Sequence, residues 1–125
     1  MNKMMTKQEA FDKVYKHFVI NGNPTSVVRK KRRNGGFVSV CMYRSPSGAK
    51  CSAGLFLHGY EYKPSYEGQP FFRVCPKRLK HLVYFIVELQ YVHDAVAMFS
   101  DEHITSSFRK KLIDVADRHN LTIPR

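Results

Sequence analysis

The chain has 125 residues and a formal net charge of +11, from 21 lysine and arginine residues against 10 aspartate and glutamate residues. This length suits one domain, residues 1–125, whose core needs no metal or disulfide for stability. The 43% hydrophobic and 13% aromatic fractions argue against disorder. An odd number of cysteines, three, argues against a disulfide framework and favours a reducing cytoplasm.

An N-terminal helix is predicted to begin after Thr6, because Thr6 and Glu9 have the spacing of a capping box. Its apolar residues recur at helical spacing: Phe11, Val14, Tyr15, Phe18 and Val19. Asn21-Gly22 ends this helix, since glycine accepts the left-handed backbone conformation. The first residues, MNKMMTKQEAF, contain no apolar segment typical of a signal peptide.

Five consecutive basic residues, Arg29, Lys30, Lys31, Arg32 and Arg33, precede the pair Gly35-Gly36. Like charges at this density repel one another, so we expect an exposed basic loop over about 27–36, or an edge strand. This run is the strongest charge signal in the chain.

A β-hairpin is predicted from Phe37–Arg44 and Ala49–Leu57, around a turn at 45–48. If Arg44 pairs with Ala49, one face of the hairpin is apolar throughout. Cys51 then points into the core and Cys41 points to the opposite face. In that register the two cysteines neither form a disulfide nor share a metal, and act as small packed hydrophobes.

Residues 58–70 are predicted to form a tyrosine-rich loop, and Phe71–Val74 a short third strand. A long central helix follows Pro76, a break is expected at 100–102, and a last helix ends near Asn120. The apolar stretch 82–99 contains Glu88 and Asp94, which favours a buried helix over a membrane span. The predicted fold class is therefore α+β.

The apolar stripe of the central helix becomes polar for one turn, at Gln90, His93 and Asp94. Unpaired buried groups would cost about 1–3 kcal/mol each, so this turn must meet polar partners. We favour a network that holds the backbone of the 58–70 loop. The alternative is a catalytic pocket, in which His93 and Asp94 act with Gln90 and His58.

A zinc site could be assembled only by the fold, from Cys51, His58, Cys75 and His93, because the chain has none of the usual short ligand motifs. We therefore predict no metal and no cofactor.

The charge is unevenly distributed, since no acidic residue lies between Asp12 and Glu61. Such a balance favours a polyanionic partner, either nucleic acid or an acidic protein surface. Arg29–Arg33 would supply most of the attraction. Secondary contacts would come from Arg44, Lys50, Arg73 and Lys77, and stacking on bases from Tyr60, Tyr62 and Tyr66.

Four short motifs together resemble a family of small phage and prophage proteins: C-x-Y-R at 41–44, G-x-K-C-x-x-G at 48–54, E-G at 67–68 and L-Q-x-x-H-D at 89–94. The family usually continues the last glycine of the second motif with Leu-Ile-Pro, where this chain has Leu55-Phe56-Leu57. The resemblance implies a mobile-element origin and an accessory role in the bacterial cytoplasm. It supplies no catalytic residues, because the family has no settled activity.

We expect a non-enzymatic protein that binds nucleic acid, or a host protein that handles nucleic acid, in host takeover or evasion of host defence. A small hydrolase or nuclease using His93 and Asp94, and a structural or packaging component, remain the alternatives. No membrane partner is expected.

Overall fold

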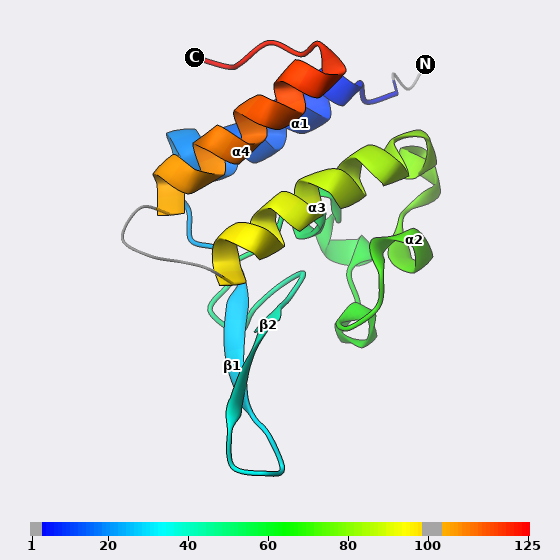
Figure 1. Ribbon diagram of the computed structural model, residues 1–125. Coiled ribbons are helices and arrows are strands. Elements are labelled where there is room, and N and C mark those ends of the chain that lie inside the picture. Colours follow the sequence, from blue (N-terminus) through cyan, green and yellow to red (C-terminus); the bar gives the residue numbers. More distant parts are fainter. Residues whose placement is uncertain (1–3, 99–103) are drawn as a thin grey trace.

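The computed structural model describes residues 4–98 and 104–125. Figure 1 shows α1 and α4 side by side along one flank of α3, while a β-hairpin projects from the other end of the molecule. Most buried residues of these helices belong to one hydrophobic cluster, in which Phe18 stacks on Phe108 with ring centroids 4.4 Å apart. The α+β class predicted from the sequence is confirmed, with two strands.

Helix α1 (Lys7–Tyr15) begins at the predicted capping box: the Thr6 side chain accepts from the Glu9 N–H, and the Glu9 side chain accepts from the Thr6 N–H. One turn of π-helix, Lys16–Ile20, extends it. The chain then reverses at Gly22, whose φ of 65° favours glycine. Both predicted ends of this helical segment are confirmed.

The hairpin consists of β1 (Val27–Lys31) and β2 (Phe37–Cys41), paired antiparallel with Val28 opposite Val40. The expected hairpin of Phe37–Arg44 with Ala49–Leu57 is wrong, because Phe37–Cys41 pairs with the segment before it. Part of the basic run forms β1, and the chain reverses at Gly35, which has φ 91°. The N–H of Arg32 donates to the carbonyl oxygen of Gly36 and closes this turn.

The predicted turn at 45–48 exists, but only an isolated bridge between Arg44 and Lys50 follows it. The expected pairing of Arg44 with Ala49 is therefore wrong. Ala53–Phe56 forms a turn of 3₁₀ helix. Residues 51–54 are all buried, which an alternating strand with one exposed face does not allow.

The 58–70 segment is the expected loop, with single 3₁₀ turns at Gly59–Glu61 and Pro64–Tyr66. The predicted third strand is wrong, since α2 (Phe71–Val74) is a short helix. Its first and last residues are buried and the two between them are exposed, which is a helical pattern.

A 3₁₀ segment, Lys77–Leu82, leads into the central helix α3 (Val83–Met98), which contacts α1, α2, α4 and β2. The break expected at 100–102 lies outside the described residues. Helix α4 (Ile104–His119) ends at Asn120, which has φ 56°, and the Leu121 N–H donates to the carbonyl oxygen of Ala116. Within residues 4–98 and 104–125, no helix is long and apolar enough to cross a membrane.

Candidate functional site

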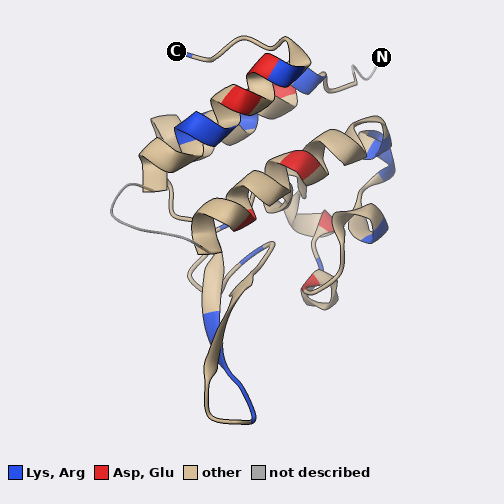
Figure 2. Ribbon diagram, in the orientation of Figure 1, with Lys and Arg blue, Asp and Glu red and all other residues tan. Residues whose placement is uncertain are grey.

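The β1–β2 hairpin is a basic arm that stands away from the helices. Figure 2 shows lysine and arginine along its outer half and no acidic residue on it. All five side chains of Arg29–Arg33 are exposed. Among the described residues, none of the five forms an ion pair. Their charge is therefore available to a partner.

The strand register places these cations on both faces of the arm. Successive side chains of a strand point to opposite faces. Arg29 and Lys31 therefore lie on one face of β1, and Lys30 lies on the other. Phe37, directly opposite Lys31, is 58% exposed, and the guanidinium carbon of Arg29 lies 5.0 Å from its ring centroid. A ligand on that face meets an aromatic ring beside the cations.

The four secondary cations predicted from the sequence differ in their surroundings. Arg44 is half-buried: it donates to the carbonyl oxygen of Leu57 over 2.9 Å, and its guanidinium carbon lies 4.8 Å from the Tyr62 ring centroid. Lys50 is also half-buried. Lys50 and Arg44 thus differ from Arg73, in α2, and Lys77, at the start of the 3₁₀ segment before α3, which are both exposed. Of this group, only Arg73 and Lys77 have exposed side chains.

Lys50 lies near His17, and both residues line one shallow pocket. Burial lowers the pKa of His17, and the charges of Lys50 and Lys13 lower it further. His17 is therefore not an additional cation at neutral pH.

The three candidate tyrosines are also unequal. Tyr60 is 83% exposed and stacks on His58, with ring centroids 5.5 Å apart. Tyr62 and Tyr66 are half-buried against the core. Burial and the hydrogen bond of Tyr62 to Glu67, 2.7 Å long, raise the pKa of Tyr62 to about 12. Tyr60 is the one of these three that offers a free ring face.

The polar turn of α3 forms the predicted buried network, but its partners are not in the 58–70 loop. The Ser26 N–H donates to Nε2 of His93 over 3.0 Å, and Nδ1 of His93 lies 3.0 Å from Oδ1 of Asp94. Gln90 accepts from the Ala53 N–H over 2.8 Å and donates to the same Oδ1 over 2.6 Å. The network therefore holds the start of the hairpin and the 3₁₀ turn after it.

Glu67 holds the other leg of the hairpin. Its carboxylate accepts from the N–H groups of Tyr43 and Arg44, over 2.8 and 3.1 Å, just beyond the end of β2. We name the four side chains Glu67, Gln90, His93 and Asp94 the hairpin anchor. Residues of the short motifs seen in the sequence thus meet at the root of the basic arm.

The geometry around His93 speaks against the catalytic alternative. The ring is fully buried. Because Nε2 accepts from a backbone N–H, the ring proton is on Nδ1 and is donated to Asp94. Neither nitrogen is then open to a substrate. His58 does not join this group: it is exposed, and its N–H donates to Glu61.

A possible metal cluster among the described residues combines Cys41, His93 and Asp94, whose ligand atoms lie within 4.8 Å of one another. The other combination considered from the sequence, Cys51, His58 and Cys75 with His93, does not form within these residues. A metal on Nδ1 of His93 would require the proton on Nε2, where it would oppose the Ser26 N–H. Burial raises the pKa of Cys41 to about 12, and the nearby Asp94 contributes. These donors do not fit a metal.

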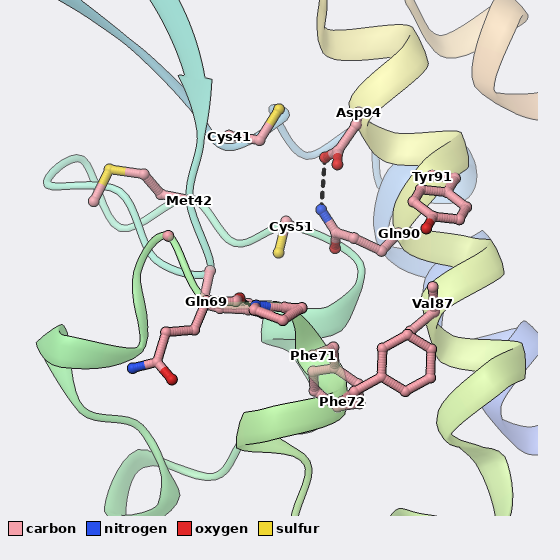
Figure 3. Close-up of a pocket in the computed structure, with 13 residues that line it drawn as sticks. Cys41, Met42, Cys51, Gln69, Phe71, Phe72, Val87, Gln90, Tyr91 and Asp94 are labelled. Atoms are coloured by element: carbon pink, nitrogen blue, oxygen red, sulfur yellow. Dashed lines mark hydrogen bonds between the residues drawn. The ribbon is translucent and has the colours of Figure 1, made fainter.

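Cys41 and Cys51 line one pocket of about 210 Å³ (Figure 3). Cys51 is buried in the core, as predicted, and neither cysteine forms a disulfide. The opposite placement predicted for Cys41 is wrong, because the hairpin on which it rested does not form. Burial raises the pKa of Cys51 to about 12 as well, so both thiols stay protonated and are poor nucleophiles at neutral pH. Sequence reasoning missed this pocket, because α2 and α3 complete it from distant segments.

Comparison of the chain with protein-family models, with curated proteins and with solved structures finds no match.

Proposed function

We propose that the protein binds nucleic acid through the basic arm, without catalysing a reaction. The observation that carries this proposal is the projecting β-hairpin with five consecutive exposed cations and no ion pair to the described part of the protein. Through the motif resemblance, we further propose an accessory protein of phage type that acts in the cytoplasm of a bacterial host.

The shape of the arm supports a nucleic-acid partner. A two-stranded β-ribbon fits the major groove of B-form DNA. Cations on both faces of such a ribbon can reach phosphates on both sides of the groove, and lysine and arginine bind phosphates well. Phe37 and Tyr60 add exposed rings that can stack on unpaired bases.

The attraction should depend steeply on salt. Each phosphate neutralised on duplex DNA contributes about −0.9 to the slope of log K against log salt concentration, so five contacts would give about −4.5. On a single strand, with about −0.7 per contact, the slope would be about −3.5.

A matched pair of variants tests the proposal. Lys30, Lys31 and Arg32 are replaced by glutamine in one protein, and Arg109, Lys110 and Lys111 on exposed positions of α4 in the other. Both variants lose two lysines and one arginine, so they have equal net charge. Fluorescence anisotropy with labelled single- and double-stranded DNA and RNA, over a salt series, gives affinity and slope.

We expect the arm variant to bind more weakly, with a duplex slope shallower by about 2.7. The α4 variant should keep the slope of the unmodified protein. Equal losses in the two variants would show that net charge, and not the arm, attracts nucleic acid. Absence of binding in the unmodified protein would overturn the proposal, and an acidic host protein would then be the expected partner.

A further inference from the structure

The pocket of Figure 3 opens at the root of the basic arm, between the end of β2, α2 and α3. Cys41, the last residue of β2, lines it, and Phe37 stands about 13 Å away at the other end of the same strand. A flexible strand of nucleic acid held by the arm therefore passes close to the pocket. Besides Cys41, its lining includes Phe71, Phe72, Gln90, Tyr91 and Asp94.

The walls of this pocket are largely apolar and aromatic. Phe71 is buried at its base, whereas Phe72 and Tyr91 are 43% and 68% exposed on its rim. Figure 3 shows the rings of α2 facing α3 across the pocket. A volume of about 210 Å³ is below the range of pockets for drug-sized ligands and suits a single flat ring system.

Asp94 is the one charged side chain among the described lining residues. Its Oδ1 already accepts from Gln90 and His93, and its side chain remains 38% exposed. A further hydrogen-bond donor would therefore bind at Oδ2. Sγ of Cys41 also lies within 4.8 Å of this carboxylate, but a thiol is a weak donor that an N–H group can replace.

The ligand must thus be flat, mostly apolar and able to donate a hydrogen bond on one edge. A basic peptide could also donate, but it would have to approach a protein with a net charge of +11. A nucleobase with an exocyclic amino group also has a hydrogen-bond donor on one edge, and the phosphates of its nucleic-acid strand are attracted to the arm.

We infer that the pocket takes one unpaired nucleobase, whose exocyclic amino group donates to Asp94. The inference rests on the proposed function, since the arm supplies most of the affinity and the pocket reads the base. Cytosine, adenine and guanine carry this amino group. Uracil and thymine instead carry a carbonyl oxygen at C4, which a carboxylate repels, and their N3–H donor is flanked by carbonyl oxygens on both sides.

Two oligonucleotides test this chemistry: oligo(dC) and oligo(dU) of equal length. Their bases differ at C4, by an amino group against a carbonyl oxygen, and at N3, by a bare acceptor against an N–H group. We expect the unmodified protein to bind oligo(dC) on the order of tenfold more tightly, because a hydrogen bond to a charged acceptor is at stake. Equal affinities for the two would overturn the inference, while salt-dependent binding through the arm would leave the proposed function intact.

Asp94→Asn is the decisive variant. Its Oδ1 can still accept from Gln90 and His93, but Oδ2 becomes an amide NH₂ group that donates. The preference for oligo(dC) should disappear or reverse. Tyr91→Ala removes a rim ring without touching the anchor and should weaken oligo(dC) binding. Tyr60→Ala, an exposed tyrosine outside the described lining, should leave the dC/dU ratio unchanged.

The arm variant should bind both oligonucleotides more weakly, with an unchanged ratio of the two affinities. If the protein binds no oligonucleotide, the proposed function fails, and titration with free cytidine and uridine then tests the pocket alone by amide chemical shifts. Cytidine should shift the amides of Cys41, Gln90 and Tyr91, whereas uridine should not. If cytidine leaves those amides unmoved, the pocket does not bind a base.

Discussion

Ser26 donates its backbone N–H to Nε2 of His93 over 3.0 Å, across 67 positions of sequence. The carbonyl oxygen of Ser26 accepts in turn from the N–H of Met42, so this residue joins both legs of the basic arm. His93 therefore fixes the arm to α3, and both of its ring nitrogens are occupied by hydrogen bonds within the protein.

Replacing His93 by alanine should lower the free energy of unfolding by about 3–5 kcal/mol. The change leaves a cavity and an unsatisfied buried N–H group at Ser26. Urea unfolding followed by circular dichroism measures it. His58→Ala, at an exposed position, should change stability by no more than about 0.5 kcal/mol. A folded His93→Ala protein of unchanged stability that had lost a biological activity would instead favour the catalytic alternative.

Glu67 provides a second test of the anchor. Glutamine at this position has one acceptor oxygen, and its NH₂ group would face an N–H or O–H donor that the carboxylate now accepts. We expect Glu67→Gln to lose about 2–3 kcal/mol of stability. Tyr62→Phe removes only the 2.7 Å bond to Glu67 and should lose about 1 kcal/mol. Equal stability of the Glu67→Gln variant and the unmodified protein would contradict this role.

Local signals in the sequence predicted the helices well. The capping box at Thr6 and the left-handed end at Asn120 depend on neighbouring residues, so a short window contains the needed information. The π-helical turn at 16–20 and the 3₁₀ start at 77–82 have no comparable signal.

The strands were harder, because pairing depends on which segment lies opposite. Phe37–Cys41 has the alternation of a strand, but its partner is the basic run, for which the sequence left an exposed loop and an edge strand as alternatives. Likewise, the sequence shows the short motifs but not that their residues come together at the root of the arm. The contact of Ser26 with His93 and that of Ala53 with Gln90 depend on how α3 crosses the hairpin root.

The two pocket thiols should resist ionisation. The pKa of Cys41 and of Cys51 rises from 9.0 to about 12, mainly because burial disfavours the thiolate. A raised pKa means that the folded state holds these protons more tightly than the unfolded state. Their contribution to stability is therefore present below pH 9 and is lost as pH rises from about 9 to 12.

Alkylation by iodoacetamide at pH 9 gives a direct reading of this effect. We expect Cys41 and Cys51 to react roughly a hundredfold more slowly in the folded protein than in urea, because only the thiolate reacts. Peptide mass spectrometry reports each cysteine separately. Rapid alkylation of either thiol in the folded state would show that it is ionised, and would reopen the question of a reactive cysteine in the pocket.

Gly54, the last glycine of the G-x-K-C-x-x-G motif, lies against the backbone of Tyr43. A Cβ atom built there would stand 2.1 Å from the Tyr43 carbonyl oxygen, far closer than van der Waals contact allows. Gly54→Ala should therefore displace the 3₁₀ turn from the hairpin root and lower stability by about 3 kcal/mol. Gly59→Ala is the matched control, because it has no atom within 4 Å of the new Cβ and no positive φ. Thermal unfolding of both variants measures the difference. An unchanged melting temperature would show that Tyr43 and Gly54 are not in contact. Because the turn also contains Ala53, whose N–H donates to Gln90, Gly54→Ala should in addition reduce the preference for oligo(dC).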